Sequence, residues 1–259
     1  GDKIGIVGIN GTGKSTLLKM IAGEETPDKG QIIKQNGLNL AYVPQNPVFS
    51  EDSTIRSYAL KKGEENWKVE SNLTELNITR FDQKIEHLSG GQKKRVVLAK
   101  ILSDDFDVLL LDEPTNHLDE AMIRWLEEYL RSYKGTVIMV THDRYFLDRV
   151  TNRILEISHG KMYGYDSDYS GFLELKAQRE EMESASERKR QSVLRMELEW
   201  AKRGCRARTT KQRARLERLE QLKNGNTPIK DQTVELDSVE TRMGTVSYTH
   251  LTLPTNSRV

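Results

Sequence analysis

Cysteine and long apolar runs are nearly absent from the sequence. Its one cysteine among 259 residues, Cys205, has no partner in the chain, which excludes an internal disulfide and a cysteine metal site. We interpret Cys205 as an incidental thiol. No stretch approaches the roughly 20 apolar residues that cross a bilayer, and no basic and then apolar leader opens the chain. We therefore expect a cytoplasmic protein of one or two domains.

Charged residues are abundant and unevenly distributed. They make up 31 % of the chain beside 36 % hydrophobic residues, a composition typical of a globular protein with a buried core. The formal net charge is only +1. Between Gly171 and Lys223, however, 15 Lys and Arg face 9 Glu and no Asp. This segment carries about +6 and leaves about −5 for the rest, so the chain has an acidic body and a basic appendage.

A glycine-rich loop follows the first apolar run. The run Lys3–Val7 leads into the sequence GINGTGKS at residues 8–15, and helix-forming residues follow it. This order of strand, loop and helix predicts a P-loop, whose backbone N–H groups bind phosphate at the start of the helix. We expect Lys14 to reach the β- and γ-phosphates of a nucleotide and Ser15 to ligate Mg²⁺. The predicted nucleotide-binding residues here are Gly8, Asn10, Gly11, Thr12, Gly13, Lys14, Ser15 and Thr16.

Turn-forming residues divide the next segment. Pro27–Gly30 and the Asn-Gly pair at residues 36–37 flank Gln31–Lys34 and Leu38–Val43. This pattern predicts a small antiparallel β-hairpin. Gln45 would then lie just after a strand, where an isolated amide has no assigned role.

Two later apolar runs end in polar residues. Val108–Leu111 is followed by Asp112 and Glu113, and Thr136–Val140 is followed by a Thr-His-Asp sequence that contains His142. Both runs are typical of strands buried in a parallel sheet. Because ligands bind at the carboxyl ends of such strands, we expect these side chains to meet the P-loop at one edge.

The acidic pair and the histidine can then be given roles in phosphoryl transfer. Asp112 is placed to hold Mg²⁺ through its water shell, and Glu113 can act as the general base or position the attacking water. His142 can donate a hydrogen bond to the γ-phosphate. Each residue taken alone is a weak signal, and their convergence on one edge is what indicates a site.

The middle of the chain resembles the ATP-binding cassette family. Leu88–Gln92 (LSGGQ), its following helix to Leu102 and the sequence LLDEPT at residues 110–115 resemble the family's signature and Walker B motifs. Gln45, His142 and Asp119 match its Q-, H- and D-loops. The resemblance covers about residues 1–166 and implies an α/β P-loop cassette with a mixed sheet, a small antiparallel β subdomain and a short helical subdomain.

The same resemblance assigns further residues to the nucleotide site. Gln45 is implied as a catalytic residue and a Mg²⁺ ligand beside Ser15 and Asp112. The signature residues are implied to bind ATP held by a different cassette, with Ser89 and Gly91 on its γ-phosphate, so that two cassettes close over two nucleotides. These signature residues are Ser89, Gly90, Gly91 and Gln92.

Two branches of the family compete for this chain. Asn116–Asp119 resembles usage in the ABC-F proteins, soluble twin-cassette ATPases that act on ribosomes, and His117 is interpreted as a marker of that branch. The stretch from Gln45 to Leu88 is short for the helical subdomain of a transporter. The alternative is the ATP-binding subunit of an ABC transporter.

A basic helical hairpin is predicted after the cassette. Helix formers run from Gly171 to about Arg203, Gly204 interrupts them, and a second helical stretch covers Thr210–Leu222. The one-sided charge of the bend and second helix suits a phosphate backbone, although a solvated face is the alternative. The predicted nucleic-acid-binding residues are Lys202, Arg203, Arg206, Arg208, Lys211, Arg213, Arg215 and Arg218.

This hairpin resembles the inter-cassette linker of ABC-F proteins, in particular the Uup-like branch. The resemblance implies ribosomal RNA and P-site tRNA as partners; DNA is the alternative. We expect residues 1–168 to form a cassette without its first strands, 169–228 the linker, and 229–244 the lead-in to a second cassette. Residues 245–259 resemble translated sequencing-adapter read-through, with a divergent natural tail as the alternative. The predicted function is that of an ABC-F ATPase using ATP and Mg²⁺.

Overall fold

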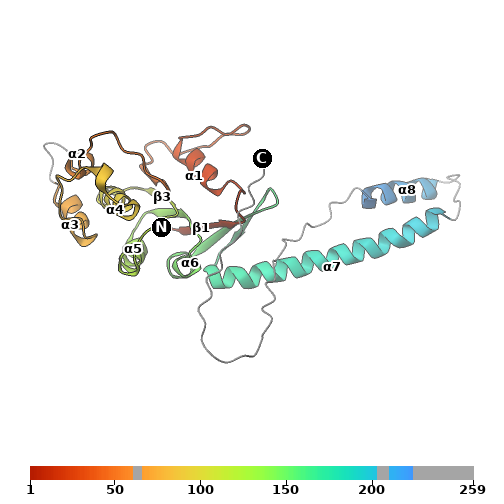
Figure 1. Ribbon diagram of the computed structural model, residues 1–259. Coiled ribbons are helices and arrows are strands. Elements are labelled where there is room, and N and C mark those ends of the chain that lie inside the picture. Colours follow the sequence, from red (N-terminus) through yellow and green to blue (C-terminus); the bar gives the residue numbers. More distant parts are fainter. Residues whose placement is uncertain (61–65, 203–209, 224–259) are drawn as a thin grey trace, which may run out of the picture.

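A six-stranded mixed sheet forms the centre of the protein (Figure 1). The computed structural model describes residues 1–60, 66–202 and 210–223. The strand order is β2-β3-β4-β1-β5-β6, and only β6 runs antiparallel, in a hairpin with β5. The strands are β1 (Lys3–Gly8), β2 (Leu40–Val43), β3 (Val108–Asp112), β4 (Thr136–Val140), β5 (Arg153–Ser158) and β6 (Lys161–Tyr165).

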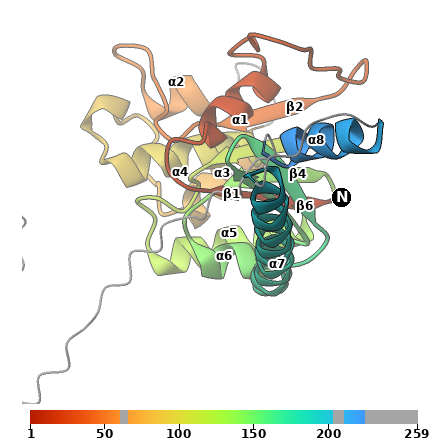
Figure 2. The ribbon, with the colours of Figure 1, turned by 90° about the vertical axis from the view of Figure 1, so that its right-hand side faces the viewer.

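Helices cover both faces of this sheet. Figure 2 shows α1 on one face and α5 and α6 on the other. The helices are α1 (Lys14–Ala22), α2 (Ile55–Ala59), α3 (Trp67–Glu75), α4 (Gly90–Ile101), α5 (Glu120–Ser132), α6 (Arg144–Val150), α7 (Tyr169–Lys202) and α8 (Thr210–Lys223), with a 3₁₀ turn η1 (Ile85–His87) before α4. Among the described residues, none of these helices is long and apolar enough to cross a membrane.

Burial on both faces explains why β3 is apolar from Val108 to Leu111. Along β3, Leu109 and Leu111 join the larger core beneath α3–α6, whereas Leu110 joins the smaller core with Leu18 of α1. Successive side chains of a strand point to opposite faces, so a strand covered on both sides needs apolar residues at every position. This confirms the predicted α/β class and the mixed sheet.

The predicted hairpin at Gln31–Lys34 and Leu38–Val43 is wrong. Residues 31–35 form no strand, and β2 pairs with β3 in parallel. The reason is burial: Ala41 and Val43 enter the larger core, and the opposite face of β2 packs against the smaller one. The segment predicted to pair with β2, Gln31–Lys34, has no comparable core to enter, since Ile33 is 83 % exposed.

The two predicted helices of the appendage are confirmed. Figure 1 shows α7 leaving the sheet and α8 lying beside its far part. Arg215 of α8 bonds Glu197 of α7 at 2.6 Å, and Arg190 of α7 bonds the carbonyl of Leu222, so the helices run antiparallel. The expected lead-in at residues 229–244 and the tail at 245–259 lie outside the described part of the chain.

The near end of α7 is fastened to the sheet by a buried glutamate. Glu156 of β5 is 2 % exposed and forms ion pairs with Lys176 at 2.7 Å and Arg179 at 3.0 Å. It also accepts a hydrogen bond from the Tyr165 hydroxyl at 3.1 Å. Glu156 is the register partner of Val7 in β1, so the helix is tied to a strand neighbouring the glycine-rich loop.

We predict that Glu156→Gln lowers the free energy of unfolding by about 3 kcal/mol, because two partly buried cations lose their shared carboxylate. Urea unfolding followed by circular dichroism measures this. The matched control is Glu180→Gln, whose carboxylate is 52 % exposed and lies 3.7 Å from the same Lys176. A surface pair of this kind contributes at most about 1 kcal/mol. Equal losses in the two variants would contradict the assignment of Glu156 as the fastening residue.

Candidate functional site

The glycine-rich loop connects β1 to α1 at the carboxyl end of β1. Gly11 and Gly13 have φ values of 81° and 87°, in the left-handed region that favours glycine. A Cβ on Gly8 would meet the Ile157 carbonyl oxygen at 2.5 Å, so the start of the loop lies directly against β5. The first-turn N–H groups of α1 are oriented toward the loop and can bind an anion.

The Lys14 side chain is hydrogen-bonded to the backbone of the loop. Its ammonium donates to the carbonyl oxygens of Gly8 at 2.8 Å and Ile9 at 3.0 Å. Burial lowers the pKa of Lys14, and the nearby charges of Glu113 and Asp112 oppose that shift. The cation therefore lies where a phosphate bound in the loop would meet it.

Oxygen ligands for a divalent cation meet beside Lys14. The Ser15 hydroxyl lies 3.1 Å from Asp112 Oδ1, and Asp112 is buried at the end of β3. A hydroxyl and a carboxylate are ligands that Mg²⁺ prefers, so this pair fits the expected ion. Tyr42, which no sequence motif marks, also reaches this site, and its hydroxyl lies 3.5 Å from Asp112 Oδ2. The wrong hairpin concealed it, because only the parallel pairing of β2 with β3 brings Tyr42 to this edge.

Glu113 and His142 meet at the same edge. Glu113 has φ 47° and is buried; its carboxylate accepts the His142 backbone N–H at 3.3 Å and lies 3.5 Å from His142 Nε2. Burial raises the pKa of Glu113, while His142 acts to lower it. A carboxylate of raised basicity that faces a mostly exposed imidazole can accept a proton from a water molecule.

Gln45 follows β2 and is exposed. Because β2 runs parallel to β3, Gln45 emerges at the same edge of the sheet as Asp112. The backbone carbonyl of Gln45 accepts a hydrogen bond from the buried Lys94 ammonium at 3.4 Å. Its predicted role as a catalytic residue and Mg²⁺ ligand stays a prediction.

The LSGGQ motif makes a different set of contacts. Ser89 caps α4 by accepting from the Gln92 backbone N–H, and the Gln92 side chain accepts from the Ser89 N–H in return. Ser89 and Gly90 are exposed. A Cβ on Gly91 would lie 2.3 Å from the His117 carbonyl oxygen, so the D-loop crosses directly over this glycine. Asp119, at the end of the D-loop, caps α5 through the Met122 N–H at 3.0 Å.

Two of the predicted nucleic-acid-binding side chains, Arg215 and Arg218, lie in the described part of α8. Arg215 bonds Glu197 and its guanidinium lies 4.1 Å from the Trp200 ring centroid, while Arg218 is exposed on α8. Arg203, Arg206 and Arg208 lie outside the described residues, as do the side chains of Lys202, Lys211 and Arg213.

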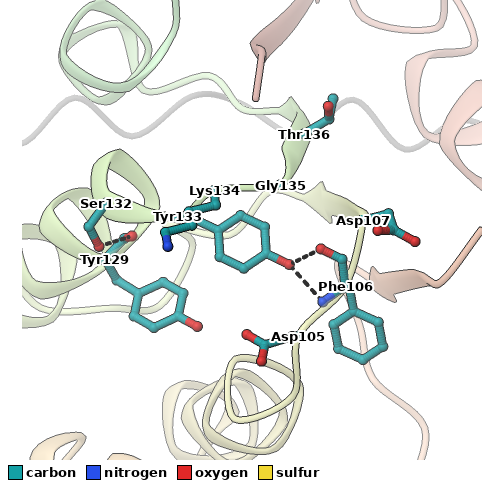
Figure 3. A pocket seen from close by; sticks show the side chains of 9 residues that line it. All are labelled: Asp105, Phe106, Asp107, Tyr129, Ser132, Tyr133, Lys134, Gly135 and Thr136. Atoms are coloured by element: carbon teal, nitrogen blue, oxygen red, sulfur yellow. Dashed lines mark hydrogen bonds between the residues drawn. The ribbon is translucent and has the colours of Figure 1, made fainter.

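A hollow of about 750 Å³ lies at the opposite edge of the sheet (Figure 3). It opens where β3 and β4 begin, and the Tyr133 hydroxyl closes one side by donating to the Phe106 carbonyl at 2.6 Å and accepting its N–H at 3.0 Å. In parallel strands the amino ends and carboxyl ends are on opposite edges, so this hollow is separate from the candidate site.

The fold and the site define a P-loop nucleotide-binding domain. A family model described as "ABC transporter" matches residues 1–116, and a second model with that description matches 155–236. The chain belongs to the ATP-binding cassette family. It is similar to the EttA proteins, which are ABC-F proteins, and this agrees with the ABC-F branch.

Two curated relatives show the extent of the similarity. "Uncharacterized ABC transporter ATP-binding protein YfmR" of Bacillus subtilis is 42 % identical over 270 residues, covering 88 % of this chain and 43 % of the relative. "Energy-dependent translational throttle protein EttA" of Haemophilus influenzae is 38 % identical over 280 residues, covering 91 % and 50 %. The chain thus spans about half the length of the curated relatives it matches.

Solved structures agree with the fold. The structure titled "RNase-L Inhibitor" is 34 % identical with a TM-score of 0.53, over 63 % of this chain and 33 % of that one. A structure of the archaeal ribosome recycling factor aABCE1 in complex with the ribosomal stalk protein aP1 has 34 % identity and a TM-score of 0.54. The match covers 63 % of this chain and 33 % of that chain. An ATP binding subunit of an ABC transporter, at 24 % identity and a TM-score of 0.57, covers 64 % of this chain and 78 % of that chain and supports the fold alone.

We predict that Gly91→Ala lowers the free energy of unfolding by about 1–3 kcal/mol, because the new methyl group would collide with the His117 carbonyl. Gly90→Ala is the control: its Cβ would meet only His117 Cδ2 at 4.0 Å. That change should be neutral or stabilise by up to about 1 kcal/mol. Chemical unfolding of both variants measures the difference, and equal stabilities would show that the close crossing is absent.

Proposed function

We propose that the protein is an ABC-F ATPase that binds and hydrolyses Mg-ATP between paired cassettes and couples this to the ribosome. One observation carries the ATPase part: Lys14, the Ser15–Asp112 pair and the Glu113–His142 pair come together at one edge of the sheet. A phosphate cradle, a divalent-cation site and a buried base are the parts that phosphoryl transfer to water requires.

The residues divide the chemistry among themselves. The loop N–H groups and the Lys14 ammonium bind the phosphate oxygens, and Ser15 and Asp112 would hold Mg²⁺. Mg²⁺ bound there supplies charge neutralisation at the β- and γ-phosphates. Glu113 orients a water molecule for attack on the γ-phosphate and accepts its proton. His142 donates to the γ-phosphate oxygens from its exposed position.

A second cassette would complete the site. Ser89 and Gly90 are exposed at the amino end of α4, and a helix amino terminus favours an anion. Ser89 and Gly91 would contact the γ-phosphate held by the other cassette. The chain's coverage of about half of its relatives supports a full-length protein with two cassettes.

The ribosome is the partner that the relatives favour. The names of the relatives include a translational throttle protein and a ribosome recycling factor. The α7–α8 hairpin supplies a basic arm, on which Arg218 is exposed and Arg215 is held by Glu197. We propose that this arm contacts ribosomal RNA and P-site tRNA, as in the Uup-like branch, in the cytoplasm. Its contacts would be mainly to phosphates.

We predict that Glu113→Gln in the full-length protein slows ATP hydrolysis by about 10² to 10⁴ and leaves Mg-ATP binding intact, because only the proton acceptor is lost. Single-turnover hydrolysis and equilibrium nucleotide binding measure the two effects. The control is Glu128→Gln, an exposed position on α5. Unchanged single-turnover hydrolysis in Glu113→Gln would remove Glu113 from the catalytic role.

We predict that replacing Arg206, Arg208, Lys211 and Arg213 together by Gln flattens the salt dependence of ribosome binding. Each phosphate contact contributes roughly 0.7–0.9 to the slope of log K against log salt, so four changes remove up to about 3. Sedimentation with ribosomes across a salt series measures the slope. ATP hydrolysis without ribosomes should stay the same.

The control variant removes the same charge from the cassette surface, at exposed positions Lys29, Lys68, Arg131 and Lys161. This control should keep more of the wild-type slope of log K against log salt. Charges that lie more than a Debye length of about 8–10 Å from the ribosome are screened and act on it only weakly. Wild-type affinity and slope in the hairpin variant would identify its charges as a solvated face. Tighter binding of duplex DNA than of ribosomes or tRNA in competition would instead favour a DNA partner.

A further inference from the structure

Lys94 is a buried cation that the sequence motifs do not assign. It lies on α4, five residues after Ser89, and is 2 % exposed. Its ammonium donates to the carbonyl oxygens of Pro44 at 2.8 Å, Asp112 at 3.0 Å and Gln45 at 3.4 Å. An ammonium has three N–H donors, so these three acceptors use all of them.

The three acceptors belong to the two strand ends that form the site. Pro44 and Gln45 follow β2, and Asp112 ends β3 immediately before Glu113. The strands are parallel neighbours, but their register pairing ends at Val43 and Leu111. Beyond that point Lys94 supplies a bridge between the two chain segments. It thereby holds the Gln45 backbone and the acidic pair at a fixed separation.

The same side chain joins these strand ends to the LSGGQ motif. The helix α4 packs against β2, α2 and α3 (Figure 1). A helix is stiff over one or two turns, so a displacement of the Ser89 end would move Lys94 as well. The motif is also held on its other side, where Gly91 meets the His117 carbonyl. Lys94 is thus the point where α4 is bonded to both strand ends.

Burying a charge here is a costly way to satisfy three carbonyl groups. An ammonium removed from water loses its hydration, and carbonyl dipoles restore only part of that free energy. The carboxylates of Asp112 and Glu113 lie near enough to contribute favourable charge interactions. The arrangement fits a group whose task is to fix geometry next to a reacting phosphate.

We propose that Lys94 is a positioning residue for hydrolysis. It holds Gln45 and the Asp112–Glu113 pair in a fixed position relative to the LSGGQ motif. This rests on the proposed ATPase function. The hydrogen bonds of Lys94 go to Pro44, Gln45 and Asp112, outside the loop that would bind the phosphates, so its loss should affect turnover and leave nucleotide affinity almost unchanged.

The test uses the full-length protein with Lys94→Met, which keeps a long apolar side chain and removes all three donors. We expect kcat for ATP to fall about 10- to 100-fold through loss of alignment, with KM and the Kd for ATP within about threefold of wild type. Lys94→Gln keeps two N–H donors on a side chain one bond shorter and should recover part of kcat. Lys100→Met, on the same helix with its ammonium 4.1 Å from the Tyr58 ring centroid, is the control.

A second measurement needs no nucleotide. Hydrogen exchange of the free protein should accelerate at residues 43–47 and 111–115 in Lys94→Met, and stay at the wild-type rate in Lys100→Met. If the wild-type protein hydrolysed no ATP, the proposed function would fail, and this exchange measurement would still decide the role of Lys94.

Three results would overturn the positioning role. One is a wild-type kcat together with unchanged exchange in Lys94→Met. Another is a loss of ATP affinity that matches the loss of kcat, which would make Lys94 a binding residue. The third is loss of the cooperative thermal transition in both Lys94 variants, which would make it a residue of fold stability.

Discussion

The parallel pairing of β1, β3 and β4 is the constraint on which the site depends. In the observed register Ile6 and Asp112 both face Val140, so the three strands end at nearly one level. The ladder continues one residue further, where the Glu113 N–H donates to the Val140 carbonyl at 2.8 Å. The glycine-rich loop, the acidic pair and His142 therefore leave the sheet side by side. A change in this register would separate groups that act only together.

Burial gives these groups their electrostatic character. Asp112 and Glu113 are nearly inaccessible to water, and two lysines, Lys14 and Lys94, lie close to them. Carbonyl oxygens accept hydrogen bonds from both ammonium groups. Dipoles and charges that are fixed before a ligand binds need little reorganisation when charge develops. The site thus holds its charged groups in fixed positions that suit a polyphosphate.

The basic arm is attached to the cassette close to this site and extends away from it. A helix of 34 residues is about 50 Å long, so the end of α7 at Lys202 lies far from the sheet. Its near end is buried through Phe172 and fastened by the ion pairs of Glu156, while its far part pairs with α8. The two ends of α7 thus have different chemistry: a packed anchor at β5 and a charged hairpin at the other end.

The sequence by itself determined the loop at residues 8–15, the acidic pair after β3, the histidine after β4 and the span of α7 and α8. These features depend on local chemistry: glycines that permit positive φ, apolar runs of strand length, and helix formers between breakers. Tertiary structure alone decided the partner of β2, and with it the positions of Tyr42 and Lys94. A four-residue strand pairs wherever both its faces can be buried, and a lysine on a helix carries no local sign that three carbonyls will surround it. These contacts join residues that are 18 to 70 positions apart in the chain, and only the packed core brings them together.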